Sequence, residues 1–314
     1  MRGDFAGGQT FSMEPKTDHI SVCICTYRRP KLLDRLLLEL QKQITENLFS
    51  YSIVVVDNDE AKSAKETVQS WMGKSTINIE YHHEPEKNIA LARNRAVRNA
   101  KGQFVAFIDD DEYPVQSWLV DLYKALHLYQ ADGILGPVKP YFENTPPSWI
   151  VKGKLCERDS FATGTYLTNP IYTRTGNVLL TRQVLSEGEN PFDPEFGRTG
   201  GEDVNFFKRM IERGRVFVWC DEAAVYENVP PERLKRSYLL KRALMRGVVN
   251  AKDASILSGD TLKSAAAFVF YTSALPFLLF TGHHRFMKYL IKDCDHIGKL
   301  AGRFGIDLVK EKNF

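Results

Sequence analysis

Short apolar runs that end in polar residues alternate with helix-compatible segments along the first third of the chain. The runs with the length and composition of buried strands lie at residues 20–27, 52–56, 77–81 and 104–108. Segments with helical spacing or helix-compatible composition lie between them, at residues 32–40, 61–72 and 88–96. Strands that alternate with helices predict an α/β fold with a mostly parallel sheet covered on both faces.

Polar side chains stand at the carboxyl ends of these predicted strands, where ligands of such sheets collect. They are Thr26, Asp57, and three consecutive aspartates, Asp109, Asp110 and Asp111. Adjacent carboxylates repel one another, so the triplet should shift its pKa values or bind a hard divalent cation such as Mg²⁺ or Mn²⁺. A solvated acidic turn is the simpler alternative.

Five motifs, taken together in order and spacing, resemble those of the family-2 glycosyltransferases, which have the fold called GT-A. The motifs are at residues 26–30 (Thr-Tyr-Arg-Arg-Pro), 55–58 (Val-Val-Asp-Asn), 88–94, 109–111 and 200–203 (Gly-Gly-Glu-Asp). Residues 134–138, 146–149 and 201–207 look like a subgroup of bacterial glucosyltransferases that build succinoglycan-type exopolysaccharides on a lipid carrier. The resemblance extends from about residue 20 to 230.

The resemblance implies a site for a UDP-sugar donor and a divalent cation. Asp57 would accept a hydrogen bond from uracil, Thr26 and Tyr27 would flank the base, and Arg93 would reach the uridine or its phosphates. Asp109 would touch the ribose, with Asp110 in the same nucleotide-binding group. Asp111, helped by Asp109, would hold Mg²⁺ or Mn²⁺ against the diphosphate.

The acidic pair Glu202 and Asp203 precedes a segment with apolar residues on one helical face. Acidic groups in the first turn of a helix can simply bind free N–H groups and complement the helix dipole. The resemblance instead makes Asp203 the base that deprotonates the acceptor hydroxyl, with Glu202 orienting the acceptor or the donor sugar. Many relatives carry a histidine shortly afterwards, but residues 224–227 read Ala-Val-Tyr-Glu, so no metal ligand is predicted there.

Composition and charge exclude several other classes of protein. The 314 residues, 43% of them hydrophobic, suffice for one α/β catalytic domain with an appended segment. A net charge of +3 without a basic, aromatic-rich tract predicts no nucleic-acid partner. The chain lacks the Gly-rich loops of dinucleotide-binding proteins, P-loop proteins and sugar nucleotidyltransferases. Five cysteines without zinc-site spacing fit core positions in a reducing compartment.

The region after residue 230 has a different character. A basic amphipathic helix is predicted first, and the resemblance makes its Arg242 and Arg246 clamps for the diphosphate. Residues 262–281 are almost uncharged, contain Pro276 and have basic residues on both sides. They predict a helix in or dipping into the inner leaflet of the membrane, with a single span and a buried core helix as alternatives.

The sequence therefore predicts a disordered leader at residues 1–18, a GT-A catalytic domain at 19–230 and a membrane-associating helical region at 231–314. The expected protein is an inverting hexosyltransferase at the cytoplasmic face of the inner membrane. It would move glucose from UDP-glucose to a polyprenyl-diphosphate-linked saccharide in bacterial exopolysaccharide or related synthesis. The alternative is an inactive sugar-nucleotide-binding subunit of an assembly complex, which should have lost Asp111 or Asp203; both are present.

Overall fold

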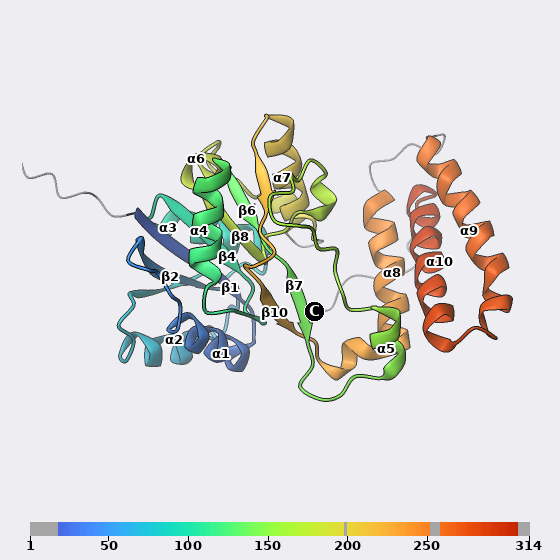
Figure 1. Ribbon diagram of the computed structural model, residues 1–314, viewed down its shortest axis with the longest axis horizontal. Helices are drawn as coiled ribbons and strands as arrows, with labels where there is room; N and C mark the ends of the chain where they lie inside the picture. Colours follow the sequence, from blue (N-terminus) through green and yellow to red (C-terminus); the bar gives the residue numbers. More distant parts are fainter. Residues whose placement is uncertain (1–17, 198–199, 252–257, 307–314) are drawn as a thin grey trace, which may run out of the picture.

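The structure is a computed structural model that describes residues 18–197, 200–251 and 258–306. It consists of an α/β body and, beside it, a unit of three C-terminal helices (Figure 1). The predicted leader falls almost wholly on residues 1–17, which lie outside the described residues. Asp18, its last residue, is already the first residue of strand β1.

The body is built on a seven-stranded sheet with strand order β3-β2-β1-β4-β8-β6-β9. Strands β1 to β4 pair in parallel, β8 runs antiparallel to β4 and β6, and β9 pairs in parallel with β6. The predicted mostly parallel sheet is thus confirmed. Its strands are β1 (Asp18–Thr26), β2 (Phe49–Asp57), β3 (Ile79–His83), β4 (Phe104–Ile108), β6 (Gly133–Leu135), β8 (Asn177–Thr181) and β9 (Phe217–Trp219).

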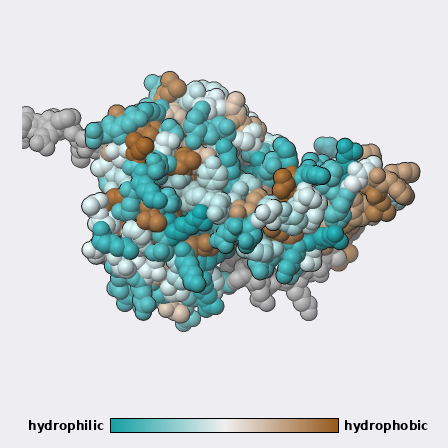
Figure 2. All heavy atoms as spheres, turned by 60° about the horizontal axis from the view of Figure 1, so that its bottom comes forward, coloured by the Kyte–Doolittle hydropathy of each residue, from teal (hydrophilic) through white to brown (hydrophobic). Residues whose placement is uncertain are grey.

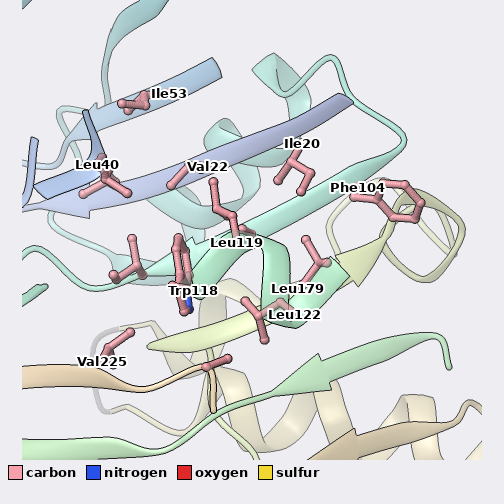
Figure 3. Close-up of a cluster of buried hydrophobic side chains, with 14 of the residues drawn as sticks. Ile20, Val22, Leu40, Ile53, Phe104, Trp118, Leu119, Leu122, Leu179 and Val225 are labelled. Carbon is pink, nitrogen blue, oxygen red and sulfur yellow. The ribbon is translucent and has the colours of Figure 1, made fainter. Parts of the chain in front are cut away.

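Helices cover both faces of this sheet, because side chains of successive strand residues point to opposite faces. On β1, Ile20 and Val22 join one apolar core, whereas Cys23 joins the other. Figure 3 shows the first core, where Trp118, Leu119 and Leu122 of helix α4 (Trp118–Tyr129) lie among apolar side chains of the sheet such as Val22 and Leu179. This core includes α1 (Pro30–Leu40), α2 (Lys65–Met72) and α4, and the second includes α3 (Ile89–Asn99), α6 (Arg182–Leu185) and α7 (Glu202–Glu212).

A small second sheet borders the carboxyl end of β4. Its order is β5-β10-β7, with β10 antiparallel to β5 and parallel to β7. The amide of Asn177 joins the two sheets, because it donates to the carbonyl oxygens of Pro137 and Ala223 while its oxygen accepts from the Trp118 indole. The strands are β5 (Glu112–Pro114), β7 (Val138–Tyr141) and β10 (Val225–Asn228).

The C-terminal unit contains α8 (Arg236–Ala251), α9 (Gly259–Leu278) and α10 (His283–Arg303). Helix α8 corresponds to the predicted basic helix, and α9 contains most of the predicted apolar segment, including Pro276. Helices α8 and α10 approach closely, since a Cβ added at Gly298 would lie 2.2 Å from the carbonyl oxygen of Leu244. Among the described residues, no helix combines the length and apolar composition needed to cross a membrane.

We expect Gly136→Ala to lower the free energy of unfolding by about 1–3 kcal/mol, the usual cost of overpacking. A Cβ at Gly136 would lie 2.3 Å from the carbonyl oxygen of Ala223 and 2.6 Å from the amide nitrogen of Asn177. Gly259→Ala is the control, because a Cβ there meets nothing within 4 Å. Thermal denaturation of both variants checks this, and equal melting temperatures would contradict the proposed joint between the sheets.

Candidate active site

The predicted polar strand ends do meet at one edge of the sheet. The Thr26 hydroxyl donates to Asp110 Oδ2 at 2.8 Å, which joins the ends of β1 and β4. One guanidinium nitrogen of Arg29 donates to Asp110 Oδ1 and to Asp111 Oδ2, both at 3.0 Å. Both oxygens of the buried Asp110 are therefore engaged by protein donors, so in this structure Asp110 holds the edge together.

Asp109 and Asp111 differ from Asp110 in their surroundings. The Asp109 side chain is 48% exposed, whereas that of Asp111 is almost buried. Burial raises the pKa of Asp111 to about 7, the carboxylates of Asp109 and Asp110 add to this, and Arg29 opposes it. The edge therefore carries more negative charge than its arginines compensate.

The carboxylates at this edge of the sheet fit a hard divalent cation only if a bound ligand supplies further oxygen atoms. Within the described part of the chain, no three His, Cys, Asp or Glu side chains are grouped so as to hold a metal. Mg²⁺, however, is commonly bound through one or two carboxylates, with waters and phosphate oxygens completing its octahedron. Asp111 and the accessible Asp109 match that arrangement, and a cation would offset both the burial and the neighbouring carboxylates that raise the pKa of Asp111.

Asp57 has internal partners that the sequence analysis did not predict. It is fully buried, and its carboxylate accepts hydrogen bonds from the backbone N–H of Asp59 at 3.1 Å and of Ala64 at 2.8 Å. The Tyr81 hydroxyl donates to it at 3.1 Å. Asp57 thus shapes the loop after β2, and its hydrogen bond to uracil stays a prediction. Tyr27 is half-buried, with the Arg28 guanidinium 5.0 Å from its ring centroid.

Helix α3 connects the sheet to the loop before α7. The Asn88 side chain caps α3 by accepting from the N–H groups of Ala90 and Leu91, and it donates to the carbonyl of Pro194. Asn94 exchanges two hydrogen bonds with the backbone of Phe192. These contacts place the start of α7 beside the carboxyl end of β4.

Arg93 makes the central contact of the site. Its buried guanidinium forms an ion pair with Glu202 in the first turn of α7 and lies 3.6 Å from Asp109 Oδ1. The predicted metal-side carboxylates and the predicted catalytic pair are thereby brought together. Burial raises the pKa of Glu202, the neighbouring Asp203 raises it further, and Arg93 lowers it. A nucleotide contact of Arg93 stays a prediction, since its guanidinium already binds these carboxylates.

Asp203 is the more accessible member of the catalytic pair. It is partly exposed, and its Oδ1 accepts the N–H of Val204 at 2.8 Å. Gly201 caps the helix with a φ of +101°, in the left-handed region that glycine tolerates, which explains the Gly-Gly before the acidic pair. Asp203 therefore has free carboxylate capacity for an acceptor proton, and its role as base stays a prediction.

A chain of ion pairs leads from the site toward the C-terminal helices. Arg233 in η3 (Pro231–Leu234) lies 3.5 Å from Asp111 and 2.7 Å from Glu227, which also pairs with Arg158. Glu227 lies opposite Glu112 on adjacent strands. The sequence analysis missed Arg29, Arg158, Arg233, Glu112 and Glu227 as site residues. Of these five residues, only Arg29 belongs to a motif that could have indicated a site residue.

The predicted diphosphate clamps differ in their placement. Arg246 lies 2.7 Å from Asp295 of α10, so it joins two C-terminal helices, and a diphosphate contact would require this pair to break. Arg242 is exposed on α8 and lies near enough to Glu227 to lower the pKa of that carboxyl. Of the two, only Arg242 lies near the site in this structure.

The fold and the site define a nucleotide-sugar transferase of the GT-A type. The family model described as glycosyl transferase family 2 matches residues 21–187, and the chain belongs to this family.

Known proteins similar to the chain extend this comparison. It is 29% identical over 311 residues to the succinoglycan biosynthesis protein ExoM of Rhizobium meliloti (strain 1021), covering 95% of this chain and 97% of that protein. It is 28% identical to the chondroitin synthase of Pasteurella multocida (strain Pm70), covering 68% of this chain but 25% of that one. The crystal structure of S. aureus TarS 1-349 in complex with UDP has a TM-score of 0.54 at 19% identity, over 94% of this chain and 95% of that one. That likeness shows the GT-A fold.

Proposed function

We propose that the protein is an inverting glycosyltransferase that moves a hexose, glucose from UDP-glucose, onto a lipid-linked oligosaccharide in bacterial exopolysaccharide or related surface-polysaccharide synthesis. The observation that carries this proposal is the bridge made by Arg93 between Asp109 and Glu202. This bridge places Asp109, which is predicted to contact the donor, beside the first turn of α7, which carries Asp203. The similarity to ExoM over nearly the whole chain supports the pathway, and TarS structures with UDP and UDP-GlcNAc support a UDP-sugar donor.

The residues of the site support a direct displacement. Asp203 takes the proton from the acceptor hydroxyl, and the acceptor oxygen bonds to the anomeric carbon as that carbon's bond to the UDP oxygen breaks. The acceptor oxygen attacks the face of the anomeric carbon opposite to the leaving UDP, which inverts the configuration of that carbon. Glu202, held by Arg93, orients the sugar. Asp109 and Asp111 would hold a Mg²⁺ or Mn²⁺ ion, which would supply the positive charge that the diphosphate needs as it leaves.

The surface of the C-terminal helices supports the proposed acceptor and location. Exposed large apolar residues gather there, and Figure 2 shows hydrophobic atoms at the outer end of the molecule, over the C-terminal helices. Four of these residues are on α9, namely Leu262, Val269, Phe270 and Phe277, and two directly follow its end, Leu279 and Phe280. Phe280 is 91% exposed and Phe277 75%. Such a surface with basic residues nearby suits the inner leaflet at the cytoplasmic face of the membrane, where a polyprenyl-diphosphate-linked acceptor would be presented.

We expect Asp203→Asn to lower the transfer rate by roughly two to four orders of magnitude while UDP affinity stays near normal, because only proton removal is lost. Single-turnover transfer and calorimetric titration with UDP measure the two effects. Glu212→Gln, an exposed change at the other end of α7, is the control and should keep full activity. Retained activity with a lower melting temperature would assign Asp203 to helix capping. UDP binding without transfer by the unaltered protein would indicate an inactive subunit.

We expect Asp111→Asn, or an excess of chelator, to abolish UDP-sugar turnover and leave the fold intact, because Asp111 would meet the diphosphate through the cation. Circular dichroism monitors folding, and Mn²⁺ binding in the presence of UDP can be measured by electron paramagnetic resonance. Adding Mn²⁺ back to chelated protein is the control and should restore turnover. Full turnover in excess chelator would overturn the metal assignment.

We expect a Phe270→Glu, Phe277→Glu double variant to bind liposomes at least about tenfold more weakly, since burial of each phenyl side chain contributes about 1.5–3 kcal/mol. Leu128→Glu is the control, because Leu128 is 73% exposed on α4, away from the C-terminal helices. Co-sedimentation with anionic liposomes, before and after a high-salt wash, separates apolar from electrostatic binding. An unaltered protein that ignores liposomes would remove the support for a lipid-linked acceptor.

A further inference from the structure

Buried polar atoms without a hydrogen-bond partner among the described residues lie near the site, and three of them belong to the segment before β8 or to the start of α7. These three are the Nε of Arg174, the hydroxyl oxygen of Thr175 and the Oε2 of Glu202. A buried polar atom without a partner costs free energy, so native structures seldom contain several together without a ligand or water to satisfy them. The Glu202 oxygen is an acceptor, Thr175 can donate or accept, and Arg174 only donates.

Arg174 is held in place by the backbone on both sides of it. The preceding turn η1 (Pro170–Tyr172) packs against α7, which carries Glu202 and Asp203. The following Gly176 lies against the acidic edge, because a Cβ there would be 3.0 Å from Asp109 Oδ2 and 2.8 Å from Glu112 Oε1. The segment between η1 and β8 thus places Arg174 between the predicted catalytic pair and the carboxylates of β4 and β5.

Arg174 differs from the other arginines of the site in its pairing. Arg29, Arg93, Arg158 and Arg233 each form at least one ion pair with a carboxylate. In the described part of the chain, the Arg174 guanidinium forms neither an ion pair within 4.0 Å nor a hydrogen bond, although it is partly buried. Burial lowers the pKa of Arg174 and the nearby Arg158 lowers it further, whereas the more distant carboxylates of Glu112, Asp203 and Glu227 raise it.

A partly buried guanidinium remains charged, and the carboxylates of Glu112, Asp203 and Glu227 act on it without forming an ion pair within 4.0 Å, so its N–H donors are left for a further anion. Its planar fork of N–H donors matches carboxylate and phosphate oxygens, which it can bind through two parallel hydrogen bonds. The unpaired oxygens of Thr175 and Glu202 are suited to sugar hydroxyls. A ligand with an oxyanion next to a sugar ring offers an acceptor to Arg174 and hydroxyl donors to Glu202.

We propose that Arg174 binds an oxyanion of the sugar-nucleotide donor, next to the transferred sugar. This inference rests on the proposed function, because it refines which group of the donor that site recognises. The oxyanion is either the diphosphate or a carboxylate carried by the sugar itself, as in a uronic acid. The second source would make the donor a UDP-uronic acid.

The test measures binding of pyrophosphate, UDP-glucose and UDP-glucuronate to the full chain and to its Arg174→Met variant by calorimetry. Arg174→Met should lose about tenfold or more in affinity, the usual effect of losing charge-assisted hydrogen bonds. Losses for all three ligands assign the diphosphate, and a loss for UDP-glucuronate alone assigns the sugar carboxylate. Arg174→Lys should recover only part of the affinity, because lysine lacks the fork.

A second readout is independent of nucleotide binding. Without ligand, Arg174→Met should melt at the same temperature as the unaltered protein or higher, because it removes an unpaired buried charge. The control Arg215→Met breaks ion pairs with Asp132 and Glu187, so it should melt lower and bind all ligands normally. Unchanged affinity of Arg174→Met for all three ligands would overturn the inference.

The same experiment separates this inference from the proposed function. If the unaltered protein binds pyrophosphate through Arg174 but neither UDP-sugar, the oxyanion site stands and the UDP-sugar donor fails. If it binds both UDP-sugars and Arg174→Met binds them equally well, the donor class stands and the role of Arg174 is wrong. If the unaltered protein binds none of the three ligands, both are wrong.

Discussion

The buried guanidinium of Arg93 is the interaction on which the site depends. It lies among carboxylates from two elements, Asp109 after β4 and Glu202 in the first turn of α7. Without a cation between them, these carboxylates and the adjoining Asp203 would repel one another at short range. Helix α3 can bring Arg93 this close because small residues, Ala90, Ala92 and Ala96, form its buried face. The small side chains of α3 therefore determine where the two acidic groups meet.

Ion pairs of alternating charge also lead from the site to the C-terminal helices. Asp111 is followed by Arg233, then Glu227, then Arg158, so each buried carboxylate on this path has a guanidinium partner. Arg233 stands directly before α8, and Trp149 of α5 (Ser148–Gly153) contacts the ring of His283 at the start of α10. The helices that expose the apolar surface of α9 are thus connected to the acidic triplet by ion pairs and a ring contact. Such a connection fixes the position of the C-terminal helices relative to the site.

The sequence predicted those parts of the site that lie at the ends of periodic elements. Thr26 and Asp110 meet as expected, because parallel strands end at the same edge of the sheet and alternation fixes which face each residue takes. Glu112 and Glu227 escaped prediction because they become neighbours only through pairing of strands far apart in the chain. Helix α10 lies within the helical region predicted at residues 231–314, although no separate helix was predicted for it. The partners of Asp57 lie in a loop whose path no periodicity encodes.

Paired and unpaired groups divide the site into scaffold and ligand-facing parts. Asp57 and Asp110 have their oxygens engaged by protein donors, which makes them parts of the scaffold despite their position at the strand ends. Asp109 and Asp203 keep exposed carboxylate oxygens, and Arg174 keeps unused N–H donors. Because a buried or half-buried charge is costly without a counterpart, a folded chain retains such groups where a ligand supplies the partner. The unsatisfied groups lie between β4, β8 and α7, and this is where the sugar should bind.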